Sequence, residues 1–263
     1  FGVATTSIVA MLGAAGLGYA TALVMWLEFI AFAVYLHRSR HFRDLALLSR
    51  FEWPEFKPIK QLLLLGVPMG IAIFMEGSLF VATALLIGRL GAVDVAAHQI
   101  ALNVASASFM IPLGVALATT VRVGHAVGAR DYPAVRWAMK AGLFLVLITQ
   151  TLSALMLVFA GHWISSWYTD DAAIAGLAGT LMIYAAIFQY PDGIQALSGG
   201  ALRGLKDTKI PMFITVFAYW AVGLSAGVYL GLHLGLRAPG FWLGLSIGLS
   251  VAAILLFYRF WRT

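Results

Sequence analysis

Long apolar segments dominate this sequence. Hydrophobic residues make up 62% of the chain and charged residues only 11%, whereas a soluble globular chain is about one-quarter charged. A helix that crosses a bilayer needs roughly 20 predominantly apolar residues. Seven segments are long enough, at about residues 11–36, 61–88, 96–121, 141–167, 172–202, 210–236 and 238–258. Because none shows the alternation of a β-barrel strand, the sequence predicts an all-α, multipass transmembrane helical bundle with seven spans.

The basic residues are distributed unevenly between the predicted loops. All 17 Lys and Arg residues except Arg89 and Arg237 fall on one side of the membrane. Loops rich in Lys and Arg stay in the cytoplasm, so the pattern predicts that Phe1 lies outside and Thr263 in the cytoplasm. The net charge of +6 is explained by this topology, and we expect no nucleic-acid partner.

The only long connection, residues 38–60, divides the predicted spans unequally. It contains the segment Glu52-Trp-Pro-Glu-Phe-Lys and is predicted to be an interfacial or amphipathic cytoplasmic linker. Residues 1–37 would then carry one span and residues 61–263 the other six. Since the chain opens with Phe1 in apolar sequence, without an initiator Met, we expect it to be a piece of a longer protein.

Two sets of glycines recur at every fourth residue in the last two predicted spans. Positions four apart lie on one helix face, where the missing side chains let another helix approach closely. Prolines within a span are expected to bend or interrupt it. The glycines are Gly223, Gly227, Gly231 and Gly235, then Gly240, Gly244 and Gly248, and the prolines are Pro68, Pro112 and Pro191.

Two acidic residues, Glu76 and Asp192, lie deep within predicted spans. A charged side chain at the bilayer centre costs roughly 2.5–3.5 kcal/mol on the insertion scale, so such residues usually serve a function. Pro191 directly precedes Asp192, and loosened backbone often accompanies an ion site. Carboxylates can exchange a proton or bind Na⁺ through hard oxygen ligands. We predict a cation site at Glu76 and Asp192, which would be a metal site only if the ion is Na⁺.

Helical spacing places amides and aromatic rings on the faces around these acids. Such faces suit a wet cavity for flat or cationic organic molecules. Hydrogen bonding between helices is the alternative role for the amides, and both roles stay open. The predicted cavity residues are Phe80 on the second span, Gln99 and Asn103 on the third, and Phe188 and Gln195 on the fifth.

An acidic pair, Asp170 and Asp171, precedes the fifth span in a predicted outer loop. Aspartates favour helix N-termini, where they cap backbone amides. A solvated cap and a site at the mouth of a cavity are both possible roles for this pair.

Neither a phosphate-binding loop nor a catalytic constellation is visible in the sequence. An ion gradient is therefore a more natural energy source than ATP. We expect no cofactor beyond a coupling ion, and a membrane-embedded enzyme is the less favoured alternative.

Four motifs link the sequence to a known family. They are Gly66-Val-Pro-Met-Gly, Met75-Glu-Gly, Gly91-Ala-Val-Asp-Val-Ala-Ala-His-Gln-Ile and Ala201-Leu-Arg-Gly-Leu-Lys-Asp-Thr-Lys-Ile-Pro. Together they resemble the C-terminal half of multidrug and toxic compound extrusion (MATE) transporters, and the two acids resemble those of the NorM-type bacterial branch. That family has twelve helices in two lobes. The resemblance implies that the first span matches the sixth helix, that residues 61–263 match the C-terminal lobe, and that the N-terminal lobe of the same protein is missing.

The same resemblance implies a function. Family members export cationic or amphipathic organic compounds across the bacterial inner (plasma) membrane in exchange for Na⁺ or H⁺. By motif, Glu76 and Asp192 match the cation site, Phe80 and Gln99 line the same cavity, and Asp170 with Asp171 matches an acidic pair near the outer mouth. Phe188 stands where a Tyr is often found, which leaves H⁺ as open as Na⁺. A lipid-linked saccharide flippase of the same superfamily is the alternative, although its cavity should be basic.

Overall fold

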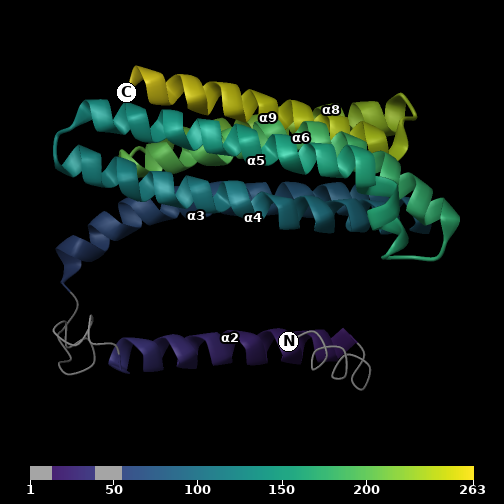
Figure 1. The fold of residues 1–263 in the computed structure, drawn as a ribbon, viewed down its shortest axis with the longest axis horizontal. Helices are drawn as coiled ribbons and strands as arrows, with labels where there is room; N and C mark the ends of the chain where they lie inside the picture. Colours follow the sequence, from purple (N-terminus) through teal and green to yellow (C-terminus); the bar gives the residue numbers. More distant parts are fainter. Residues whose placement is uncertain (1–13, 39–54) are drawn as a thin grey trace. The chain divides into compact units, whose positions relative to one another are not determined.

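The structure is a computed structural model that describes residues 14–38 and 55–263. The chain divides into two units between Ile59 and Lys60, and α2 (Ala14–Arg38) belongs to the first (Figure 1). Most of the predicted linker, with the motif that begins at Glu52, lies outside the described residues. The predicted division into residues 1–37, 38–60 and 61–263 stays a prediction.

Every regular element in the described residues is a helix. Seven helices are long and apolar enough to cross a membrane, so the predicted all-α fold and span count are confirmed. After α2 the elements are α3 (Phe56–Gly88), α4 (Ala92–Gly128), α5 (Tyr132–Ser166), α6 (Ala172–Gly204), α7 (Lys209–Val216), η2 (Phe217–Leu224), α8 (Ser225–Val228), η3 (Tyr229–His233) and α9 (Arg237–Arg262).

The helix α5 begins nine residues before the predicted start of its apolar segment. The Asp131 side chain accepts a hydrogen bond from the Ala134 amide (3.0 Å), and Pro133 lies in the first turn. Both are strong helix-start signals, and hydropathy alone does not detect them because the first turns of α5 also carry Arg136 and Lys140.

The sixth span is a single run, residues 209–233, that contains two π-helical segments, η2 and η3. A π-helix is wider than an α-helix and is frequently found at functional sites. The sequence predicted a regular helix here, because no residue pattern marks the extra residue that a π-turn accommodates.

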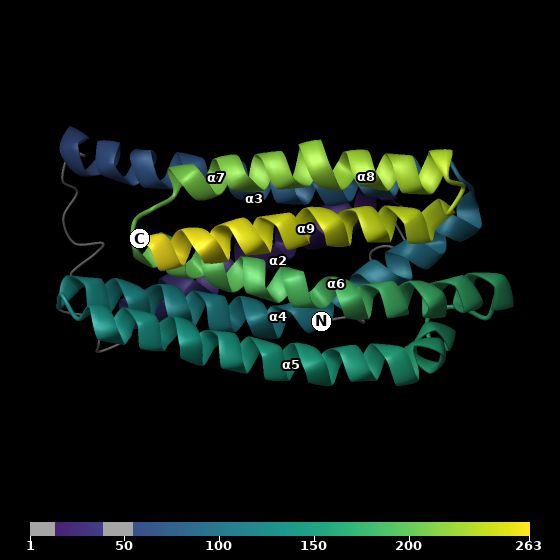
Figure 2. The same ribbon diagram turned by 90° about the horizontal axis from the view of Figure 1, so that it is seen from above.

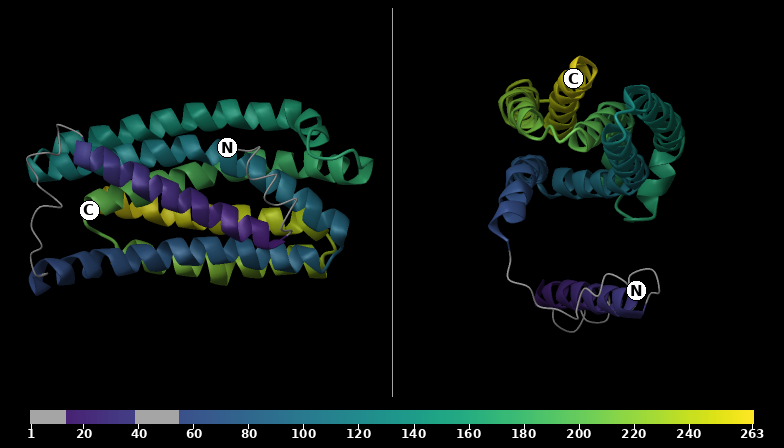
Figure 3. Two further views of the ribbon diagram at one scale, coloured as in Figure 1. Left: turned by 90° about the horizontal axis from the view of Figure 1, so that it is seen from below. Right: turned by 90° about the vertical axis from the view of Figure 1, so that its left-hand side faces the viewer.

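The helix α6 lies at the centre of the second unit, among α4, α5 and α9 (Figures 2 and 3). Its contact with α4 is close because Gly200 has no side chain: a Cβ there would lie 2.6 Å from the Ala116 carbonyl oxygen. The Thr120 hydroxyl donates to the Gly200 carbonyl at 2.8 Å. The helix continues through Pro191, so the predicted interruption beside Asp192 does not occur, although Pro191 still lacks an amide donor.

The predicted glycine faces pack against each other. A Cβ on Gly248 would lie 2.7 Å from the Cα of Gly223, and one on Gly240 would lie 2.6 Å from the amide nitrogen of Gly231. The predicted close approach of another helix to each glycine face is therefore confirmed, and the structure shows that the two faces are each other's partners. Gly235 was wrongly included in this face: it has φ +70° and no neighbour within 4 Å of its Cβ position, because it belongs to the turn before α9.

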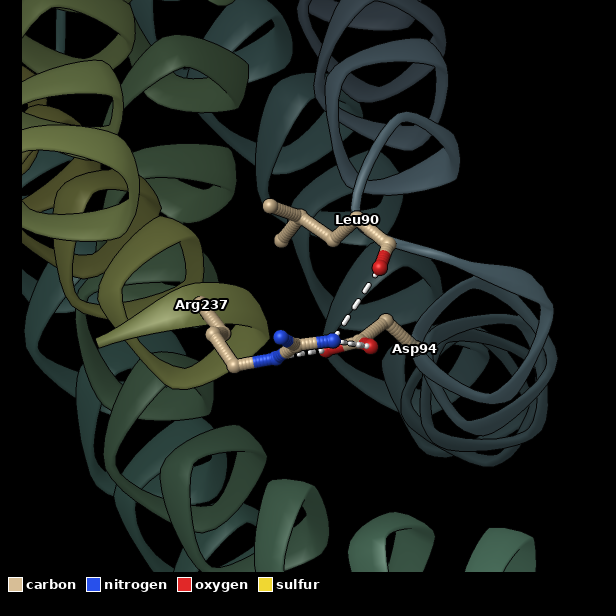
Figure 4. Close-up of polar contacts among 3 residues, drawn as sticks. All are labelled: Leu90, Asp94 and Arg237. Atoms are coloured by element: carbon tan, nitrogen blue, oxygen red, sulfur yellow. Dashed lines mark hydrogen bonds and ion pairs between the residues drawn. The ribbon is translucent and has the colours of Figure 1, made fainter. Parts of the chain in front are cut away.

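An ion pair joins the turn between α3 and α4 to the start of α9 (Figure 4). Arg237 donates to both carboxylate oxygens of Asp94, at 2.5 and 3.2 Å, and to the Leu90 carbonyl at 3.1 Å. Asp94 is 3% exposed. Arg237 is one of the two basic residues on the poorly basic side, and its charge is balanced by this bidentate contact.

Candidate functional site

The two intramembrane acids interact with each other across two helices. Glu76 lies in α3 and Asp192 in α6, and their carboxylates are coupled electrostatically. Asp192 is 6% exposed and Glu76 is partly buried. Two anionic carboxylates repel each other where water is excluded, so a proton or a cation between them would relieve the repulsion.

Arg203 is a charged residue that interacts with Glu76 and that was predicted to lie after the end of the fifth span. It was predicted in a cytoplasmic loop, but it lies in the last turn of α6, where it is partly buried and interacts electrostatically with Glu76. The span predicted from hydropathy ended at Leu202. An Arg residue lowers the mean hydropathy of its segment regardless of the direction in which its side chain points. The group of two acids and one guanidinium keeps a net negative charge when both acids are ionised.

Tyr219 is the second residue that sequence reasoning missed. It is fully buried in η2, and its hydroxyl accepts a hydrogen bond from the Gln195 amide at 2.5 Å. The hydroxyl also interacts electrostatically with Glu76 and Asp192. A tyrosine hydroxyl that accepts one hydrogen bond still has its own proton to donate, so Tyr219 adds a hydrogen-bond donor to the electrostatic group of the two acids.

The predicted aromatic residues form a packed row rather than an open wall. Phe188 is buried between Phe80, at 6.1 Å between ring centroids, and Trp242, at 5.6 Å. All three rings meet edge to face, which is a favoured geometry. The ring of His98 continues the row at 5.8 Å from Trp242. Phe80, which is only partly buried, is the member of this row that can reach a cavity.

The buried amides divide into two roles. The Gln150 amide of α5 donates to the Gln189 carbonyl of α6 at 2.7 Å, which is the helix-joining role. Gln195 instead contacts Tyr219, and its Oε1 has no hydrogen-bond partner among the described residues. That free acceptor, one turn from Asp192, is available to a bound cation or a water molecule.

The amides of α4 lie apart from this group. Gln99 and Asn103 are exposed, and among the described residues neither forms a hydrogen bond to Glu76 or Asp192. Asn103 accepts a hydrogen bond from the Tyr168 hydroxyl at 3.0 Å, which links α4 to the turn before α6.

The acidic pair lies at this same turn. The Asp171 side chain accepts hydrogen bonds from the amides of Ala173 (2.8 Å) and Ile174 (3.3 Å), so it caps α6. Asp170 is exposed and does not cap the helix. The two aspartates therefore differ in structure, and Asp170 is the one whose carboxylate is free to meet a ligand.

No group of three or more His, Asp or Glu side chains gathers in the part of the chain that the structure describes. The oxygens near the two acids come from different chemical classes: two carboxylates, the Tyr219 hydroxyl and the Gln195 amide. Hard cations such as Na⁺ are bound by oxygen donors of these kinds, and the carboxylates can equally take a proton.

Comparisons with known proteins agree with this architecture. Residues 68–228 match the family MatE. The chain is 55% identical over 251 residues to the "Probable multidrug resistance protein NorM" of Xanthomonas axonopodis pv. citri (strain 306), covering 95% of this chain and 55% of that protein. It is 40% identical over 256 residues to "Multidrug resistance protein PmpM" of Pseudomonas aeruginosa, covering 96% and 54%.

A solved structure shows the same fold. The "eukaryotic MATE transporter AtDTX14" superimposes with a TM-score of 0.86 at 21% sequence identity, over 99% of this chain and 59% of that chain. The chain thus spans about half the length of the curated relatives it matches. The match to MatE covers more than half of the chain, and with the seven apolar helices it establishes a multipass membrane protein. The chain belongs to the MATE family, whose members are transporters and not enzymes.

Proposed function

We propose that the full-length protein exports cationic or amphipathic organic compounds across a bacterial inner membrane in exchange for Na⁺ or H⁺. In this proposal Glu76 and Asp192 bind the coupling ion. The observation that carries it is the electrostatic interaction of these two acids, from α3 and α6, with each other and with a buried tyrosine hydroxyl. A charged side chain within a membrane costs free energy, so two such side chains that interact with each other support a functional site.

The coupling follows from charge. An ion bound between Glu76 and Asp192 neutralises their repulsion and stabilises one conformation of the site. When the ion leaves, the anionic site attracts an organic cation and favours another conformation. Since each ligand shifts the equilibrium by its differential affinity, the downhill ion drives the uphill compound.

The substrate cavity in this proposal lies between the present helices and the N-terminal lobe of the same protein. Its wall is formed by Phe80, Gln99 and Asn103, with Asp170 and Asp171 near the outer mouth. The sequence also predicted Phe188 and Gln195 in this wall, but both are buried, so in the proposal they lie behind it, with Phe188 against Phe80 and Gln195 bonded to Tyr219. The exposure of Gln99 and Asn103 supports this, because amides on a membrane-spanning helix avoid lipid. The C-terminus is cytoplasmic by the distribution of Lys and Arg.

A flippase for lipid-linked saccharides would need a cavity that attracts phosphate. Arg203 is a basic group that interacts with Glu76, and it is outnumbered by the two acids Glu76 and Asp192. This balance favours a cationic ligand over an anionic one.

Transport into everted vesicles tests the proposal. Vesicles that contain the full-length protein should take up a fluorescent organic cation when a Na⁺ gradient or a proton gradient is imposed separately. The gradient that drives uptake identifies the coupling ion. Uptake equal to that of empty vesicles under both gradients would refute the proposal.

A further inference from the structure

A groove runs between α4 and α5 near the turn that joins them. Its volume is about 790 Å³, and its lining includes Gly114, Ala118 and Arg122 of α4 and Trp137 and Leu145 of α5. A second hollow of about 360 Å³ lies beside it, and Pro133 and Trp137 line both. The two hollows therefore adjoin at Pro133 and Trp137.

The groove is open because of its small residues. A Cβ on Gly114 would meet no atom within 4 Å, whereas one on the neighbouring Gly142 would lie 2.7 Å from both Leu197 and Thr119. Gly142 thus serves helix packing, and Gly114 leaves space that no part of the second unit fills. The surface is apolar and exposed in this unit, since Trp137 is 71% exposed and Leu145 is 49% exposed.

The end of the groove near the turn is basic. Arg122 lines the groove, and Arg136 and Lys140 line the adjoining hollow. All three are exposed, and the Lys140 ammonium lies 5.9 Å from the Trp137 ring. Asp131 is the acidic residue of this lining, but its carboxylate caps α5 through the Ala134 amide. The rim therefore presents three cations to a ligand.

We propose that this surface binds one anionic phospholipid, with an acyl chain in the apolar groove and the phosphate between Arg122, Arg136 and Lys140. Basic pockets between membrane helices on the cytoplasmic side recognise anionic head groups. The turn lies at the end of the bundle that carries most of the Lys and Arg residues. Trp137 suits the interface between head groups and acyl chains.

Lipid retention by the purified full-length protein tests the charge requirement. Phosphatidylglycerol and phosphatidylethanolamine are added in turn, and the bound lipid is counted by native mass spectrometry. The variant Arg122→Gln/Arg136→Gln/Lys140→Gln should bind phosphatidylglycerol at least about tenfold more weakly, since each basic residue contributes about fivefold near a charged surface. The matched control Lys60→Gln/Lys206→Gln/Lys209→Gln removes three exposed charges that do not line the groove, and it should bind nearly as the wild type does.

A second variant tests the groove without changing its charge. Gly114→Leu/Ala118→Leu fills the open space and should weaken phosphatidylglycerol binding several-fold, while glycerol phosphate, which has no acyl chain, should not bind detectably to the wild type. Circular dichroism checks that each variant keeps its helices, and the groove variant carries the test if the charge variant fails to fold. Equal retention of the two lipids, equal loss in the control, or normal binding by the groove variant would overturn the proposal.

Discussion

Each of the helices α6 and α4 carries a stripe of predicted site residues that share one helix face. The two stripes have the same helical spacing, but the α6 stripe is buried and the α4 stripe is exposed. On α6, Phe188, Asp192 and Gln195 are buried. Phe188 contacts Phe80 and Trp242, and Gln195 contacts Tyr219. On α4, Gln99 and Asn103 are exposed. The spacing tells which residues share a face, whereas the neighbouring helices decide whether that face becomes an ion site or the wall of a cavity.

This difference assigns different tasks to the two stripes. A buried carboxylate with charged and hydroxyl neighbours can change its charge state and so shift a conformational equilibrium. An exposed amide can only select among ligands that touch it. Changes on α6 should therefore affect coupling, and changes on α4 should affect which compounds are carried.

The largest effect is expected from the acids. In the full-length protein, Glu76→Gln and Asp192→Asn keep the side-chain shape and remove the charge, so the coupling ion loses its ligand. Both variants should reach the membrane in near-normal amount and lose most coupled efflux, at least about tenfold on the scale of a lost charged interaction. Efflux per molecule, normalised to protein in the membrane by immunoblot, measures this. Low abundance with normal efflux per molecule would indicate a structural role instead.

The next effect concerns the hydroxyl that Tyr219 supplies. Tyr219→Phe leaves the Gln195 amide without its acceptor, which costs about 1–3 kcal/mol for a buried group, and removes a donor near both acids. We expect a several-fold loss of coupled efflux. The variant Phe188→Tyr/Tyr219→Phe returns a hydroxyl from α6 and should recover part of the loss. The single variant Phe188→Tyr is the control. If it changes efflux as much as the double variant does, the recovery does not come from replacing the hydroxyl that Tyr219→Phe removes.

Asp94 is a buried charge on α4 for which we expect a structural role and no role in transport. Asp94→Asn leaves Arg237 without its counter-ion. The free energy of unfolding should fall, but by less than for a fully buried pair, since Arg237 is largely exposed. Thermal unfolding in detergent should show a lower midpoint, while efflux per molecule stays near the wild-type value. A loss of efflux without a loss of stability would place Asp94 in the transport machinery.

The smallest effect is expected from Gln99→Ala. The side chain is exposed and has no part in the group around Asp192, so coupling should persist while the relative export of different compounds changes a few-fold. Resistance profiles of cells that express the variant against several organic cations measure this change. A uniform loss for all compounds would show that Gln99 acts with the α6 stripe.

Sequence alone predicted the features that depend on one helix or on a repeating pattern. The seven spans follow from hydropathy, and the close approach of a helix to each glycine face follows from the spacing of four residues, although that spacing did not show that the two faces meet each other. The features it missed depend on neighbours or on local backbone geometry. Tyr219 lies in a π-helical segment that carries no residue signature, and Arg203 was excluded from α6 because an average over a window cannot tell where a charged side chain points.

The acids show the same limit. Their depth in apolar segments marked them as functional candidates, but only the tertiary fold brings Glu76, Asp192 and Tyr219 into one electrostatic group. The exposure of Gln99 and Asn103 could not be predicted either. Helical periodicity shows which residues share a face, but it does not show what packs against that face.

In the proposed mechanism, the coupling ion and the organic cation compete through Glu76 and Asp192. This competition can be measured as the dissociation constant of tetraphenylphosphonium for the purified full-length protein, over a range of Na⁺ concentrations and of pH. We expect Na⁺ or protons to weaken tetraphenylphosphonium binding, and this dependence to disappear in Asp192→Asn, since binding linkage is reciprocal. A wild-type dissociation constant that neither ion changes, or a dependence that survives in Asp192→Asn, would show that the two ligands do not compete through these acids.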